Sequence, residues 1–304
     1  MDLLVVGSIA LDTIETPFAS VSETPGGSAL YISISASYFT DSIGLVGIVG
    51  DDFPKDVIDE LRQRNVNLSG LKIVPGARTF RWAGKYHYDM NTRETIYTQL
   101  NVFSAFDPVI PDHFKSSKYI CLGNIDPVLQ MKVLSQVQSP KLVIADTMNF
   151  WIERKFDELL ETLKHVNVLI VNDAEARQIA RELNLIKAGR KILKLGPDVV
   201  IIKKGEHGAV LMIDNAIFSA PAYPIEAIQD PTGAGDTFAG GFAGWLARTG
   251  DVSEKNLRRA VIYGSAIASF CVEDFGINRI RKLSWEDIQK RFRAFKEMTS
   301  FEVD

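Results

Sequence analysis

The most specific motif of this chain is the stretch Asp230-Pro-Thr-Gly-Ala-Gly-Asp-Thr-Phe-Ala-Gly-Gly-Phe242. An extended segment, residues 224–232, leads into the Gly-Ala-Gly bend, and we expect a helix from Gly235 to Arg248. Gly233 and Gly235 have no Cβ, so the backbone can approach a ligand closely there. The first N–H groups of a helix lack intrahelical partners and carry partial positive charge. The stretch therefore predicts an anion-binding site, with phosphate as the preferred anion.

Asp236 places a carboxylate at this same helix entrance. A carboxylate in an anion-binding site needs a role, and the role we infer is to accept a proton from a hydroxyl that attacks phosphorus. Amides that hold the charge and a carboxylate that activates the nucleophile are the two parts that phosphoryl transfer needs. The alternative is that Asp236 only complements the helix dipole.

The whole run from Asp230 to Phe242 resembles the C-terminal signature of the PfkB/ribokinase family of small-molecule kinases. The resemblance implies that Asp236 is the general base and that the amides of Gly233, Ala234 and Gly235 form an anion hole. It extends over nearly the whole chain, because weaker family motifs follow one another in the family's order. Neither GxxxxGK[ST] nor GxGxxG after the first strand is present, so this loop is the strongest phosphate-binding candidate.

Length and composition fit this interpretation. The chain has 304 residues, a net charge of −4 and 46% hydrophobic residues, which permits one large α/β domain or two smaller ones. The absence of a Lys/Arg cluster argues against nucleic acid or a membrane surface as a partner. The sequence has no apolar run of ~18 residues and no signal peptide, so we expect a cytoplasmic protein. Cys121 and Cys271 lie in apolar surroundings and suggest neither a disulfide nor a metal site.

Short apolar runs alternate with helical patterns along most of the chain, which predicts a mostly parallel sheet with helices on both faces. The expected strands are Leu3–Val6, Ile43–Val46, Lys118–Leu122, Leu142–Ala145, Val168–Val171, Val199–Ile202 and Ala209–Ile213. The expected helices, besides the one at Gly235, are Ala29–Phe39, Pro54–Arg64, Val128–Val137, Phe156–Lys164, Asp173–Leu183, Lys255–Val272 and Trp285–Thr299.

Two stretches break this rhythm, and we interpret them as a small β lid. Residues 12–23 are extended and polar, and residues 77–100 alternate with period two around a turn at Asp89–Arg93. The alternation puts four aromatic residues on one face, namely Phe80, Trp82, Tyr86 and Tyr88. Because an isolated hairpin is marginal in water, this face should cover the substrate, a second subunit, or both.

The resemblance implies a ribokinase-like, doubly wound α/β domain with an inserted β lid. We assign residues 1–12, 26–75 and 101–304 to the kinase domain and residues 13–25 and 76–100 to the lid. A homodimer through the lid follows only from the resemblance.

The acceptor is expected near the carboxyl end of the first strand, where ligands bind in open α/β sheets. Asp12 lies just beyond that strand and can bind two adjacent hydroxyls, although it is equally a turn residue. Gly26 and Gly27 open the next helix, and similar glycines contact substrate in the family. The family then has an Asn where this chain has Tyr31, so this motif does not assign a ribose-like acceptor. Asn149 follows a buried strand and resembles a family Asn near substrate or phosphate.

The donor side of the site is expected at three further segments. Asn172-Asp-Ala-Glu175 has the pattern of a capping box, and the resemblance implies that Asn172 and Glu175 position Mg²⁺, largely through water. The nucleotide-binding candidates are Lys203, Gly205, Gly208, Gly264 and Gly276; Lys203 is equally a solvated residue, and Gly264 equally a helix-packing one. Asp230 and Thr232 match positions that hold a monovalent cation such as K⁺ in some relatives.

These residues together predict an ATP-dependent kinase for a hydroxyl of a small sugar, polyol or nucleoside. One alternative is a kinase of the same fold for a hydroxymethylpyrimidine or pyridoxal-type alcohol, although such relatives largely lack the lid. The other is a ligand-binding protein on this scaffold without turnover, against which the retained Asp236 argues. The aromatic lid face would suit a stacked ring such as a nucleobase, and would equally suit a partner lid.

Overall fold

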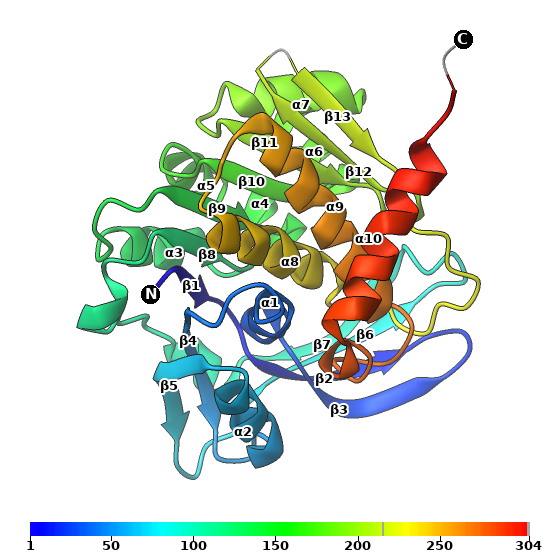
Figure 1. The fold of residues 1–304 in the computed structure, drawn as a ribbon. Helices are drawn as coiled ribbons and strands as arrows, with labels where there is room; N and C mark the ends of the chain where they lie inside the picture. Colours follow the sequence, from blue (N-terminus) through cyan, green and yellow to red (C-terminus); the bar gives the residue numbers. More distant parts are fainter. Residues whose placement is uncertain (215, 303–304) are drawn as a thin grey trace.

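The computed structural model describes residues 1–214 and 216–302. Its larger sheet is built from β1 (Leu3–Val6), β4 (Ile43–Gly50), β5 (Val66–Val74), β8 (Tyr119–Leu122), β9 (Leu142–Asp146), β10 (Val168–Asn172), β11 (Val199–Lys203), β12 (Ala209–Ile213) and β13 (Ala216–Ala220). The strand order is β13-β12-β11-β10-β9-β8-β1-β4-β5 (Figure 1). The strands from β11 to β5 pair in parallel, and β12 and β13 add an antiparallel edge.

Helices cover both faces of this sheet, as the alternating pattern predicted. One face packs against α1 (Ser28–Ala36), α2 (Lys55–Gln63), α8 (Ala234–Thr249) and α9 (Glu254–Cys271), with α10 (Trp285–Thr299) outside α9. The other face packs against α3 (Pro127–Leu134), α5 (Phe156–Leu163), α6 (Asp173–Ala180) and α7 (Leu185–Leu193), with the short α4 (Asn149–Arg154) nearby. The expected doubly wound α/β fold is therefore confirmed.

The seven strands expected from apolar runs are all present, and most extend by one to four residues at an end. Four elements were not expected from the sequence: β5, β13, α4 and α7. β5 has one buried residue in nine, because it forms an edge of the sheet, and it therefore lacks a continuous apolar run. Within the described residues, no helix combines the length and the apolar character that a membrane span requires.

A second, four-stranded sheet corresponds to the expected lid. It consists of β2 (Ala10–Glu15), β3 (Ser20–Gly26), β6 (Phe80–Tyr86) and β7 (Arg93–Gln99), in the order β3-β2-β6-β7. β2 and β6 pair in parallel, and the other two pairs are antiparallel. Strands β2 and β3 together extend slightly beyond both ends of the expected lid segment 13–25. The exact domain boundaries stay a prediction.

The lid face with Trp82 and Tyr86 lies against the main domain. Tyr86 packs with Ile14 and Met90, and this cluster meets Ile228 and Phe275 of the main domain. The expectation for Tyr88 was wrong. It lies in the turn beyond β6, is 82% exposed, and contacts Phe18 instead of the main domain.

Gly240 provides a test of how closely α8 packs on α1. A Cβ at Gly240 would lie 2.4 Å from the carbonyl oxygen of Ile32. Helix propensity alone predicts that Gly240→Ala stabilises the protein by up to ~1 kcal/mol. We expect the opposite sign, a decrease of ~1–3 kcal/mol in the free energy of unfolding, because a closely packed backbone would have to move. Urea unfolding of both proteins measures this, and a more stable variant would show that α1 and α8 are not in close contact.

Candidate active site

The entrance of α8 has the geometry that the sequence predicted. Gly233 is the N-cap residue, with φ 76° in the left-handed region, and the helix begins at Ala234, one residue earlier than expected. A Cβ at Gly233 would lie 2.2 Å from the ring of Tyr31, and one at Gly235 would lie 2.7 Å from Lys203 Nζ. The Tyr31 ring leaves no room for a side chain at Gly233, whereas the flexible end of Lys203 could move away from one at Gly235. Ala234 N donates to the carbonyl oxygen of Pro231 at 3.2 Å, and among the described residues the amides of Gly235 and Asp236 have no backbone partner, so these two can donate to an anion.

Asp236 lies in the first turn of α8, beside a cluster of buried charges. Burial, together with the carboxylate of Asp146, raises the pKa of Asp236 to about 7, against the opposing effect of Lys203. The Nζ atom of Lys203 is 3.5 Å from Asp146 Oδ2. A carboxylate with a pKa near neutrality is well suited to accept a proton at neutral pH.

Asp230 and Thr232 brace the loop that leads into α8. Asp230 is fully buried; its Oδ1 accepts a hydrogen bond from Thr232 N at 2.8 Å, and its Oδ2 accepts one from Gly276 N at 3.1 Å. Thr232 Oγ1 is 3.2 Å from the Tyr86 hydroxyl of the lid. These contacts account for both residues structurally, and their role at a monovalent cation stays a prediction.

Asp12 lies on β2 at the lid face that meets the main domain, and it is buried. Burial, together with the carboxylates of Asp230 and Asp236, raises the pKa of Asp12 to about 8. Gly26 is required here, because a Cβ would lie 2.0 Å from Asp12 Oδ2. Gly27, with φ 91°, is the N-cap of α1 and donates its N–H to Asp12. Both glycines thus help to hold the Asp12 carboxyl group in place.

Tyr31 does not line an open pocket. Its side chain is 1% exposed and lies beneath the bend at Gly233. The Tyr31 hydroxyl has no hydrogen-bond partner among the described residues. Tyr31 therefore packs beneath the bend at Gly233.

Asn172 and Glu175 form the capping box that their spacing suggested. Asn172 Oδ1 accepts from Glu175 N, and Glu175 Oε2 accepts from Asn172 N, both at 2.8 Å. Burial and the neighbouring Asp146 raise the pKa of Glu175 to about 7. Within the described residues, no group of three or more His, Cys, Asp or Glu residues is arranged to hold a metal. The carboxylates of Glu175 and Asp146 fit Mg²⁺, which keeps several of its waters.

The glycines expected at the nucleotide fall into two groups. Gly205 (φ 55°) and Gly208 (φ 82°) shape the turn after β11, and Gly276 (φ 56°) follows α9. Gly264 has a packing role, since a Cβ there would lie 2.8 Å from the carbonyl oxygen of Phe238 on α8. Asn149 begins α4 and is exposed.

Two residues of the site were not assigned from the sequence. Asp146 is the last residue of β9 and is 8% exposed. In this segment Asp146, and not the exposed Asn149, therefore joins the charged cluster. Its position directly after a buried strand could have indicated this. Arg93 lies on the lid opposite Tyr86 and interacts electrostatically with Asp236 and Glu175. Nothing in its local sequence distinguishes Arg93 from a surface arginine.

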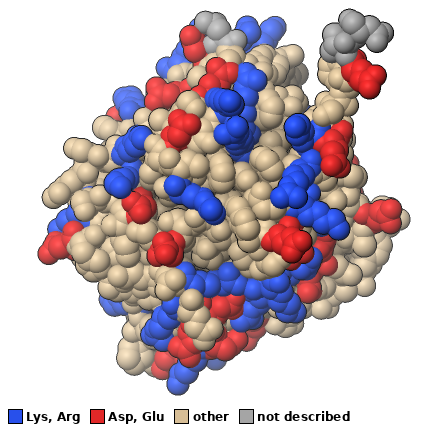
Figure 2. Space-filling view, in the orientation of Figure 1, with Lys and Arg blue, Asp and Glu red and all other residues tan. Residues whose placement is uncertain are grey.

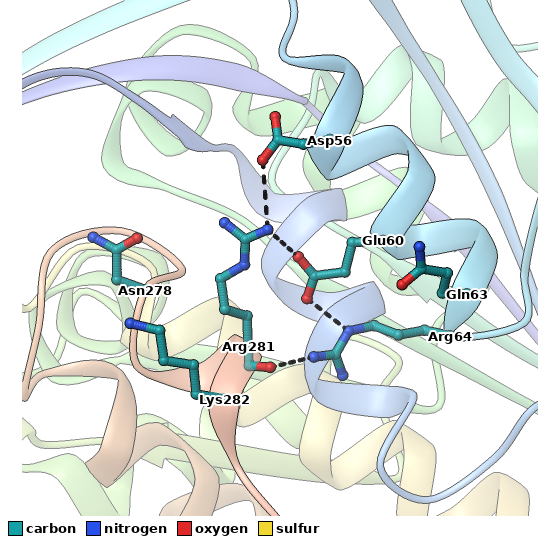
Figure 3. A pocket seen from close by; sticks show the side chains of 7 residues that line it. All are labelled: Asp56, Glu60, Gln63, Arg64, Asn278, Arg281 and Lys282. Carbon is teal, nitrogen blue, oxygen red and sulfur yellow. Dashed lines mark hydrogen bonds and ion pairs between the residues drawn. The ribbon is translucent and has the colours of Figure 1, made fainter.

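A polar cavity of about 570 Å³ lies elsewhere, between α2 and the 3₁₀ helix η4 (Ile280–Lys282). Its lining residues are Asp56, Glu60, Gln63, Arg64, Asn278, Arg281 and Lys282 (Figure 3). Glu60 pairs with both Arg64 and Arg281, and Arg64 also donates to the Arg281 carbonyl oxygen at 2.5 Å. These ion pairs tie α2 to η4. On the face with α8, α9 and α10, Lys and Arg are interspersed with Asp and Glu (Figure 2).

The model of the pfkB family carbohydrate kinases matches residues 2–282. This chain belongs to the pfkB family. Its kinase relatives include the cytidine kinase of Thermococcus kodakarensis, which is 31% identical over 82% of this chain and 89% of the relative. A solved nucleoside kinase from Methanocaldococcus jannaschii superposes with a TM-score of 0.76 at 22% identity, covering 97% of this chain and 99% of that one. The Burkholderia thailandensis nucleoside kinase in complex with inosine gives 0.76 at 19% identity, covering 96% of each chain.

The raised pKa of Asp236 in this pfkB-family kinase predicts a pH dependence of stability. The carboxyl ionises near 3.8 in the unfolded chain and near 7 in the folded one, so the folded state binds more protons between these values. Its contribution to stability therefore falls as the pH rises through this range.

Asp236→Asn removes this effect. In ligand-free protein we expect the variant to unfold at a higher temperature than wild type at pH 8, with a smaller difference at pH 5. Thermal unfolding of both proteins at both pH values checks this. If the gain in stability of the variant over wild type were smaller at pH 8 than at pH 5, the pKa shift would be contradicted.

Proposed function

We propose that this pfkB-family kinase transfers the γ-phosphoryl group of ATP to a hydroxyl of a nucleoside. One observation carries this proposal: at the entrance of α8 the amides of Gly235 and Asp236 have no backbone partner among the described residues and lie in the same turn as the Asp236 carboxyl group. Lys203 lies against Gly235, and Asp12 is close enough for its charge to interact with that of Asp236. Phosphoryl transfer depends mainly on such positioning and on electrostatic stabilisation. Asp236 accepts the proton of the attacking hydroxyl, and the amides of residues 233–236 stabilise the phosphoryl group in flight.

The donor side needs cations, because the carboxylates of the site would repel the negatively charged phosphates of the donor. Lys203 is placed against Gly235, where it can approach a donor phosphate as a point charge. Glu175 and Asn172 would hold Mg²⁺ largely through water, and the ion would neutralise charge on the donor phosphate oxygens. A protein of similar fold, described as a putative ribokinase II from E. coli, was crystallised in complex with ATP and Mg²⁺.

The acceptor side favours a ring next to a polyol. Asp12 offers two carboxyl oxygens that can form hydrogen bonds with two adjacent hydroxyls. Trp82 lies on the same lid face, at the register position opposite Asp12, and is only partly buried. An aromatic face of this kind stacks on a nucleobase. Together with the relatives named cytidine kinase and nucleoside kinase, these features favour a nucleoside over a simple sugar.

The direct test is ADP release on a panel of acceptors with Mg²⁺ and ATP. The panel contains the common ribonucleosides, free ribose, fructose, an inositol and a hydroxymethylpyrimidine. We expect turnover with at least one nucleoside at a kcat/KM well above that of any sugar. Preference for a sugar or for the pyrimidine alcohol would reassign the acceptor, and no ADP release with any acceptor would favour a binding protein.

Asp236→Asn tests the general base. We expect kcat to fall by ~10²–10⁴-fold, because the variant cannot accept the proton, while ATP binding is largely kept. Asp59→Asn is the matched control, since Asp59 is an exposed residue of α2 paired with Arg62. Steady-state kinetics of both variants measures this. If Asp236→Asn turned over near the wild-type rate, Asp236 would not be the general base.

Trp82→Ala tests the stacked base. Base–aromatic stacking is worth ~1–3 kcal/mol, so we expect KM for the nucleoside to rise by about 5–150-fold. Trp82→Phe keeps an aromatic face and should lose much less. Equal KM values in all three proteins would show that the base lies elsewhere.

A further inference from the structure

A hollow of about 420 Å³ lies at the base of the lid, between the edge strand β5 (Figure 1) and the 3₁₀ helix η1 (Asn101–Ala105). We call it the lid-base hollow. Its lining includes none of the residues of the candidate active site. Its volume is that of a small-molecule site, since ligand cavities measure roughly 300–1,000 Å³. Its floor is apolar and consists of Ile48, Val74, Ala77, Val102 and Ala105.

Two cations border this apolar floor, Lys72 on β5 and Arg78 in the segment that leads to β6. Both are exposed, and neither side chain has an ion-pair or hydrogen-bond partner among the described residues. No described residue that lines the hollow carries a carboxylate. The cavity between α2 and η4 differs in this respect, because there Glu60 already pairs with Arg64 and Arg281 (Figure 3).

This combination indicates the chemistry of the ligand. Two neighbouring cations without carboxylates produce a positive potential that attracts an anion. The apolar floor gains ~25 cal/mol for each Å² of apolar ligand surface that it removes from water. The lid-base hollow therefore fits a small molecule with an apolar body and one anionic group, such as an aromatic carboxylate. A polyanion such as a nucleotide fits less well, because most of the lining residues are apolar.

The hollow lies where the chain crosses between the lid and the main domain. One crossing leads from β5 into β6, and the other leads back from β7 to η1. The two crossings are joined to each other, because Val102 N donates to the carbonyl oxygen of Arg78 at 3.1 Å and Asn101 Nδ2 donates to that of Thr79 at 2.9 Å. Both crossings contribute residues to the lining, so an occupant would contact both.

The first crossing is also anchored to the main domain. Thr79 is fully buried, and its Oγ1 donates to Asp52 Oδ1 at 2.6 Å. Asp52 in turn pairs with Arg81 of β6 at 2.9 Å. β6 carries Trp82 and pairs with β2, the strand of Asp12. A ligand that binds this arrangement of the crossings therefore favours the lid position in which Trp82 and Asp12 face the main domain.

We propose that the lid-base hollow is an effector site for a small carboxylate with an apolar body, and that its occupancy tightens the binding of the acceptor. The binding site itself does not depend on the reaction, whereas the effect on the acceptor rests on the proposed function. Coupling between two sites is reciprocal, so the acceptor also tightens the binding of the effector by the same factor.

The binding experiment uses para-fluorobenzoate as the probe and follows it by fluorine NMR with the full chain. Para-fluorobenzamide has the same ring without the charge, and acetate has the charge without the ring. The double variant Lys72→Met/Arg78→Met removes both cations, and Ala105→Phe fills the hollow from an exposed position. Arg190→Met is the matched control, because Arg190 is an exposed cation on α7, which packs at the other end of the sheet.

We expect fluorobenzoate to bind wild type and Arg190→Met equally, and acetate not to displace it. The double variant should bind it roughly 3–30-fold more weakly, the range expected for two exposed charge pairs. Ala105→Phe should not bind it, and unfolding temperatures near that of wild type show that the variants are folded. Wild type should bind fluorobenzamide at least about threefold more weakly, a comparison that needs no variant. A smaller difference for the double variant or for fluorobenzamide overturns the proposal.

Steady-state kinetics with the best acceptor of the panel tests the effector role. Saturating fluorobenzoate should lower KM for the acceptor at least about fivefold, the low end of usual allosteric couplings, in wild type and in Arg190→Met. The double variant should show no such effect at the same concentration. A smaller decrease overturns the effector role, and an increase in KM for the acceptor or for ATP overturns it in favour of binding in the active site.

The outcome is separable from the proposed function. A preference for a sugar would refute the nucleoside assignment and leave both experiments valid with that sugar as the acceptor. Without wild-type turnover the kinase proposal itself fails, while fluorine NMR still decides whether the lid-base hollow binds the carboxylate.

Discussion

Excess negative charge around one helix entrance is the constraint on which the rest of this site depends. The carboxylates of Asp146, Glu175 and Asp236 lie close enough for their charges to interact, and Lys203 lies among them. Burial raises the pKa of Glu175 and of Asp236 to about 7, so the cluster holds protons near neutrality. Such a site is stabilised by anything that brings compensating cations, and a donor phosphate with Mg²⁺ does so.

The fold explains how residues so distant in the sequence reach this entrance. Asp146, Asn172 and Lys203 each end a parallel strand, and the carboxyl ends of parallel strands meet at one edge of the sheet. α8 arrives at the same edge from the other end of the chain, because its small residues let it approach α1 and α9 closely. A Cβ at Gly244 would lie 2.8 Å from Ala36 Cα, for example. The glycine-rich stretch therefore encodes both the anion-binding bend and the packing that places it.

The sequence predicted the elements that depend on local pattern and missed those that depend on pairing. Continuous apolar runs predicted the buried strands, and the glycines predicted the bend at the entrance of α8; the anion site there stays a prediction. β5 lacked such a run because it is an edge strand. Arg93 could not be assigned, since its place in the cleft depends on the register of β6 with β7 and on where the lid docks. Tyr88 was misplaced because the period-two pattern was extended into a turn.

The central claim is that the entrance of α8 holds the phosphoryl group in flight beside Asp236. A crystal structure with ADP, Mg²⁺, aluminium fluoride and the acceptor tests this most directly, because aluminium fluoride takes the place of the transferring group. Our account predicts the fluoride complex within hydrogen-bond distance of the amides of residues 233–236, with the acceptor hydroxyl on Asp236. A fluoride complex bound away from these amides, or an acceptor hydroxyl out of reach of Asp236, would contradict it.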